Sequence, residues 1–99
     1  MEISRRIEFN LKDEPFKSLL EDNFISYEIS KDIDNQIMKI VLKRHYININ
    51  LCIEYCFPAF DYIDIIMENI YNKLCELISI RPENNPWQFL YVCYYISIS

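Results

Sequence analysis

Three carboxylates near the middle of the chain have a spacing that could bind a divalent cation. Asp61, Asp64 and Glu68 are three and four residues apart, which places them on one face of a helix. Hard cations need several oxygen ligands at close range, and an acidic stripe could also dock a partner. The alternative is a solvated polar face opposite an apolar one, which amphipathic patterning alone demands. We favour this alternative and predict no metal site.

A histidine beside two cationic residues could act as a general base. His45 is the only histidine in the chain and follows Lys43 and Arg44. A nucleophile pair would have to join it to a cysteine, and a third group would have to orient it. No such set is visible, and we expect these three residues at a reversal of the chain. We therefore interpret His45 as a surface turn residue and expect no enzymatic activity.

The four cysteines contain no Cys-x-x-Cys pair; they are Cys52, Cys56, Cys75 and Cys93. On one strand, Cys52 and Cys56 would be about 13 Å apart, too far for a disulfide. We expect buried thiols that pack as small apolar groups, with a link from Cys56 or Cys75 to Cys93 as the alternative. Glycine is absent, which excludes the glycine-rich loops that bind phosphates, so we expect no cofactor.

Five cationic residues could form a patch for single-stranded nucleic acid, with tyrosines stacking on the bases: Arg5, Arg6, Lys39, Lys43 and Arg44. The formal net charge of −5 opposes this and makes double-stranded nucleic acid an improbable ligand, because such binding is mostly phosphate neutralisation. The acidic excess lies in residues 51–99, so a nucleic-acid site would have to use the first half. We keep this as the alternative function.

The elements that would position these residues follow from hydrophobic periodicity. Residues 3–12 alternate apolar and polar side chains, which predicts a strand, and a short helix through Glu21 follows Asp13-Glu14-Pro15. Strands are predicted at 24–30, 37–42 and 47–57, with a hairpin turn at Asp34-Asn35. A long amphipathic helix is predicted from Pro58 to about Ile80, then a loop at 81–86 and a strand at 87–98.

This order, β-α-β-β-β-α-β, predicts one α+β domain over residues 1–99. We expect an antiparallel sheet of about five strands with one short and one long helix packed on one face. Just over half of the residues are apolar, which is typical of a folded domain. The longest nearly unbroken apolar run, residues 89–96, is far shorter than a bilayer span, so we expect no membrane span.

The predicted last strand is apolar on both faces, which suggests an interface. Leu90 and Val92 belong to one face, and Phe89, Tyr91 and Tyr95 belong to the other. Helices on one side of a sheet would leave the second face uncovered, so either the chain itself or a second copy must shield it. We predict a homodimer that uses Phe89, Tyr91 and Tyr95, with Ile65 as a further exposed apolar residue on the polar face of the long helix.

The composition also resembles a group of viral proteins. Residues 46–50 read Tyr-Ile-Asn-Ile-Asn, residues 91–96 read Tyr-Val-Cys-Tyr-Tyr-Ile, and alanine and glycine are nearly absent. In this the chain resembles the orphan proteins of A+T-rich archaeal filamentous and rod-shaped viruses, such as Acidianus filamentous viruses, with a phage or a large eukaryotic DNA virus as the alternative source. The resemblance implies an acidophilic, hyperthermophilic host and carries over no functional residue.

These observations favour a viral accessory protein that is not an enzyme and acts by binding another protein, viral or host. We expect it in the host-cell cytoplasm or in the virion.

Overall fold

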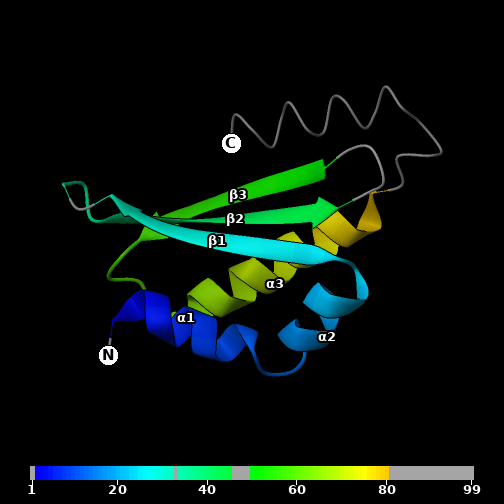
Figure 1. Cartoon of the computed structure of the whole chain (residues 1–99). Helices are drawn as coiled ribbons and strands as arrows, with labels where there is room; N and C mark the ends of the chain where they lie inside the picture. Colours follow the sequence, from blue (N-terminus) through cyan, green and yellow to red (C-terminus); the bar gives the residue numbers. More distant parts are fainter. Residues whose placement is uncertain (1, 33, 46–49, 81–99) are drawn as a thin grey trace.

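The computed structural model describes residues 2–32, 34–45 and 50–80. Within these residues the chain is an α+β fold of three helices and a three-stranded antiparallel sheet. The three helices lie on the same face of the sheet (Figure 1). In chain order the elements are α1 (Ile3–Leu11), α2 (Phe16–Asp22), β1 (Ile25–Asp32), β2 (Ile37–His45), β3 (Asn50–Pro58) and α3 (Ile63–Ser79).

The sheet is a meander in the order β1-β2-β3, each strand antiparallel to the next. Its register joins Tyr27 to Leu42 and Leu42 to Ile53, so apolar side chains line up across all three strands. This confirms the predicted α+β class and the antiparallel pairing. The predicted count of about five strands is wrong for the described part of the chain, which has three. The predicted loop at 81–86 and strand at 87–98 lie outside the described residues.

Residues 3–12 form helix α1, so the predicted first strand is wrong. Ile3, Ile7 and Leu11 are four residues apart and share one helical face, where Ile7 and Leu11 are fully buried. The same three residues also fit an alternating pattern, and Phe9 is the residue that separates the two interpretations. A strand would bury Phe9 beside Ile7, whereas the helix leaves its side chain 68% exposed.

The predicted reversal at Lys43, Arg44 and His45 is also wrong, because these residues are the last part of β2. β1 begins at Ile25, and its first residues need backbone partners. Arg44 lies opposite Ile25 in the ladder, and the His45 N–H donates to the Phe24 carbonyl at 3.0 Å. The register of the hairpin therefore extends β2 to His45.

The turn between β1 and β2 is held by Asp32, which is two positions before the predicted turn residue Asp34. The Asp32 carboxylate accepts from the backbone N–H groups of Asp34 (3.2 Å) and Asn35 (3.3 Å) and from the Asn35 side chain (2.8 Å). These bonds, led by the Asn35 side chain, lower the pKa of Asp32. The positive φ of 52° falls on Gln36.

Helices α2 and α3 lie where the sequence predicts helices, but α3 is shorter than predicted. Pro58 ends β3, the Ala59 N–H donates to the Gln36 carbonyl at 2.8 Å, and the Asp61 N–H donates to the Pro58 carbonyl. These bonds hold a turn before the helix begins at Ile63. Phe60, which falls within the predicted helix, lies in this turn instead and is 77% exposed.

The core lies between the helices and the inner face of the sheet. In the described part of the chain its buried side chains are all apolar. The helices contribute Ile7, Leu11, Leu20, Ile66, Met67, Ile70, Leu74 and Leu77, and the strands contribute Ile25, Met38, Ile40, Leu42, Leu51, Ile53 and Phe57. The alternate strand residues, among them Ser26, Lys43 and Glu54, point to the other side, which we call the outer face.

Candidate functional site

The predicted acidic residues do not form a metal site. Asp64 and Glu68 are exposed on α3, and Asp61 lies in the turn before it. Over the described residues, no group of three or more histidine, cysteine, aspartate and glutamate side chains could hold a metal ion. Asp64 and Glu68 lie on the exposed side of α3, whereas the prediction that Asp61 shares this helical face is wrong because the helix begins only at Ile63.

The predicted basic patch is spread over both sides of the sheet. Lys39 and Lys43 extend from the outer face, where Lys39 lies 3.9 Å from the Glu54 carboxylate. Arg5 and Arg6 are exposed on α1, which lies on the inner side (Figure 1). The structure therefore places these four cations in two separate regions.

Arg44, the fifth predicted cation, contacts the end of α3. Its Nη1 donates to the carbonyl oxygens of Leu77 (3.2 Å) and Ile78 (3.0 Å), in the last turn of the helix. The negative end of the helix dipole favours a cation at this end of the helix. Arg44 thus joins β2 to α3.

Of the residues predicted to form an interface, Phe89, Tyr91 and Tyr95 lie outside the described residues. Ile65 is on the solvent side of α3, where its side chain is 46% exposed.

Cys52, Cys56 and Cys75 are free thiols, while Cys93 lies outside the described residues. The expectation that all of the thiols are buried is wrong for Cys56 and Cys75, which are exposed. Cys56 alternates onto the outer face of β3, and Cys75 follows buried Leu74 on the solvent side of α3.

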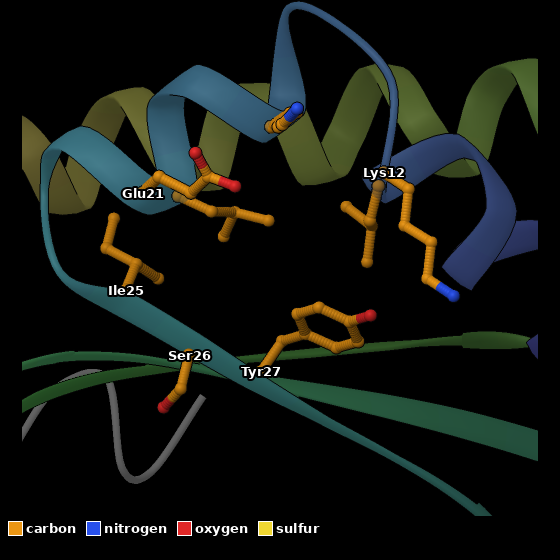
Figure 2. Close-up of a pocket in the computed structure, with 8 residues that line it drawn as sticks. Lys12, Glu21, Ile25, Ser26 and Tyr27 are labelled. Carbon is orange, nitrogen blue, oxygen red and sulfur yellow. The ribbon is translucent and has the colours of Figure 1, made fainter.

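A hollow of about 550 Å³ opens between β1 and the two N-terminal helices. We call it the β1 groove, and its lining comprises Leu11, Lys12, Lys17, Leu20, Glu21, Ile25, Ser26 and Tyr27. Figure 2 shows Ile25 and Tyr27 rising from β1 toward the helices, while the Ser26 side chain points away. Buried Leu11, Leu20 and Ile25 give the groove an apolar floor. This size is in the range of sites that hold one or two side chains or a small molecule.

The charged residues that line the β1 groove are two lysines and one glutamate. Lys12 and Lys17 line it from the helical side, with Glu21 as the one acidic group in its lining. Burial raises the pKa of Tyr27, and the nearby Glu8 carboxylate raises it further. Tyr27 is therefore a neutral phenol at physiological pH and is able to donate a hydrogen bond.

The strand that borders this groove has one open edge. In the described sheet β1 pairs with β2 alone. The bond from the His45 N–H to the Phe24 carbonyl identifies residues 24 and 45 as a hydrogen-bonded pair. Because such pairs alternate along an antiparallel ladder, the backbone groups of Glu28 and Ser30 face β2. Those of Tyr27 and Ile29 face the open edge.

A second polar cluster lies on the outer face, at the end of the sheet where β2 ends and β3 begins. The Ser26 Oγ is 2.9 Å from the His45 Nε2, and the His45 Nδ1 is 3.1 Å from the Asn50 Oδ1. All three side chains are exposed. Ser26 and Asn50 were not among the predicted site residues, because His45 was expected in a turn and not in a strand. A correct prediction of the β1–β2 register would have placed Ser26 and His45 close together.

No protein-family model, curated protein or solved structure matches this chain. Function must therefore be argued from the geometry. Of the helices in the described ranges, none has the length and apolar character needed to cross a membrane.

Proposed function

We propose that this protein binds an extended segment of a partner protein, which adds as a strand to the open edge of β1. The observation that carries this proposal is that the open edge and the β1 groove adjoin one another. An added strand would pair with the edge-facing backbone groups of Tyr27 and Ile29. Its alternate side chains would point toward the helices and into the groove.

The groove would supply the specificity that backbone pairing lacks. Backbone hydrogen bonds to a strand edge do not depend on the partner's sequence, so side-chain pockets must select it. An apolar anchor on the floor of Leu11, Leu20 and Ile25 would contribute about 1.5–3 kcal/mol by leaving water. The anchor would rest against side chains that the core already holds in place, so little ordering would be needed there.

The lysines at the groove define the charge of the partner segment. Among the residues that line the groove, Lys12 and Lys17 outnumber Glu21, although the Glu8 carboxylate also lies near Tyr27, so an acidic side chain placed next to the two lysines would be attracted and a basic one repelled. Side chains two residues apart share one face of a strand. The expected partner is thus an extended segment with an apolar residue and an acidic residue two positions apart.

The test is selection of random ten-residue peptides displayed on phage, followed by fluorescence anisotropy with the selected peptide. We expect enrichment of an apolar residue spaced two positions from Asp or Glu. Ile29→Pro removes an N–H that faces the open edge and leaves the β1–β2 ladder intact, so it should abolish binding to a folded protein, as judged by circular dichroism.

Charge reversal provides the second comparison. Lys12→Glu and Lys17→Glu should weaken binding at least tenfold, whereas Arg5→Glu, a matched reversal on α1 outside the groove, should leave the affinity within about twofold. Equal affinity of the wild type and folded Ile29→Pro would overturn the proposal.

Light scattering tests a second copy of the chain as the occupant of the β1 edge. This would be a different interface from the predicted homodimer, which uses Phe89, Tyr91 and Tyr95. A dimer that Ile29→Pro converts to monomer would assign the β1 edge to self-association and overturn the proposed partner.

A further inference from the structure

The cluster on the outer face has the geometry of a nucleophile, a base and an orienting group. Ser26 lies in β1, His45 at the end of β2 and Asn50 at the start of β3, so the two adjacent strand pairings bring them together. We propose that these three residues form an acyl-transfer site for small carboxylic esters. Ser26 also belongs to the lining of the β1 groove, but its side chain points away from the helices that border the groove, and the proposed acyl transfer does not depend on the proposed peptide binding.

The hydrogen bonds determine which imidazole nitrogen carries the proton. The Oδ1 of Asn50 can only accept, so the Nδ1 of His45 at 3.1 Å must donate. In the neutral imidazole the Nε2 is then an acceptor, and the Ser26 hydroxyl at 2.9 Å donates to it. This is the tautomer that a general base needs in order to take a proton from serine.

A small hollow beside Ser26 would receive the acyl group. It has a volume of about 100 Å³, and Ser26, Glu28, Val41 and Lys43 are among the residues that line it. That volume fits a short acyl chain such as acetyl. Lys43 is the direct cross-strand neighbour of Ser26, and its ammonium supplies a positive charge for an oxyanion that develops there.

The reaction balances with water as the only co-reactant. The Ser26 Oγ attacks the ester carbonyl carbon while its proton moves to the His45 Nε2. The carbon–oxygen bond to the alcohol breaks, and the departing alkoxide takes that proton, which leaves an acetyl group on Ser26. Water then attacks this acyl-serine, His45 accepts the proton of the water and returns it to Oγ, and the carboxylic acid is released.

The solvent exposure of Ser26, His45 and Asn50 limits the expected rate of the reaction. All three side chains are open to solvent, so the site does not exclude water and the developing charge is screened. We expect slow turnover, with general-base assistance of about 10²-fold. The acyl-serine is therefore a better readout than the rate of hydrolysis.

The experiment treats the full chain with p-nitrophenyl acetate and locates the acetyl group by peptide mass spectrometry. We expect acetylation of Ser26, its loss in Ser26→Ala and in His45→Gln, and about a tenfold slower reaction in Asn50→Ala. Ser30→Ala changes a serine on the same face of the same strand and should react like the wild type.

Peptide mapping is essential because cysteine, lysine and histidine side chains can also react with this ester. Acetyl groups found only on those side chains would overturn the proposal. An unchanged release of p-nitrophenol by Ser26→Ala would overturn it as well, because side chains other than Ser26 would then account for the reaction.

Discussion

Neighbouring residues of one strand have different roles in this protein because they point to opposite faces of the sheet. Tyr27 and Leu42 point toward the helices, whereas Ser26 and Lys43, one position away in each strand, point to the outer face. The inner face holds the core and, at the edge of β1, continues into the groove. The outer face carries polar and charged side chains and the Ser26–His45–Asn50 cluster. One alternating pattern thus separates the proposed binding surface from the proposed chemistry.

The largest expected effect of this difference is on stability. Leu42 is fully buried on the inner face, and its neighbour Val41 is only half-buried on the outer face. We expect Leu42→Ala to lower the free energy of unfolding by about 2–5 kcal/mol and Val41→Ala to lower it by about 1 kcal/mol or less. Urea denaturation measures both. Equal losses would mean that the two faces are equally buried.

The next largest expected effect is a difference in stability between substitutions of two adjacent cations of β2, Arg44 and Lys43. Arg44→Ala leaves the last carbonyls of α3 without the guanidinium, so we expect a loss of about 1.5–3 kcal/mol in the free energy of unfolding. Lys43→Ala, which removes a charge from the outer face, should change it by about 0.5 kcal/mol or less. Urea titrations measure the loss of stability in both variants. A larger loss for Lys43→Ala than for Arg44→Ala would contradict the stabilising role of Arg44 at the end of α3.

A smaller effect concerns alkaline pH and the two inner-face tyrosines. Burial raises the pKa of Tyr27 and of Tyr55, although the hydrogen bond from Asn69 at 2.9 Å partly lowers the latter. A raised pKa means that the folded state holds the proton more tightly than the unfolded state does. Its stabilising contribution is full below the usual value near 10 and is lost as pH rises through the folded-state pKa.

We therefore expect the free energy of unfolding to fall above about pH 10, and to fall less steeply in Tyr27→Phe and Tyr55→Phe. Tyr62→Phe, at an exposed tyrosine, is the control. Urea titrations at several alkaline pH values give the slopes, and parallel slopes for all variants would contradict the burial of these phenols.

The last comparison distinguishes helix from strand at residues 3–12, and its smallest expected effect is that of Phe9. Phe9 is exposed on α1, so Phe9→Ala should change the free energy of unfolding by about 0.5 kcal/mol or less. Ile7→Ala, two residues away, should cost about 2–5 kcal/mol. Thermal unfolding by circular dichroism would show both effects, and similar losses would restore the predicted strand.

The sequence predicted correctly those elements in which the spacing of apolar residues fits only a helix or only a strand. Ile37 to Leu42 and the long stretch around Ile66 and Ile70 fit one period each, and they form β2 and α3. Residues 3–12 fit two periods because Ile3, Ile7 and Leu11 satisfy both, and only packing against α3 decides between them. The interpretation of Phe89, Tyr91 and Tyr95 as an interface stays a prediction.

The candidate sites were not predictable in the same way, because they depend on register and on the arrangement of elements. Ser26 and His45 are nineteen positions apart, and only the extension of β2 to His45 brings them within 2.9 Å. The β1 groove requires Lys12 and Lys17 from the helical side to lie over Tyr27. No local pattern encodes that arrangement once residues 3–12 are interpreted as a strand.

Hydrogen exchange of the β1 amides, followed by nuclear magnetic resonance, tests the proposed edge most directly. In the free protein the amides of Tyr27 and Ile29 should exchange faster than those of Glu28 and Ser30, which bond to β2. A peptide selected on the protein should slow the exchange of Tyr27 and Ile29 and leave the other two unchanged. Uniform protection along β1 in the free protein, or bound peptide without new protection at Tyr27 and Ile29, would contradict strand addition at this edge.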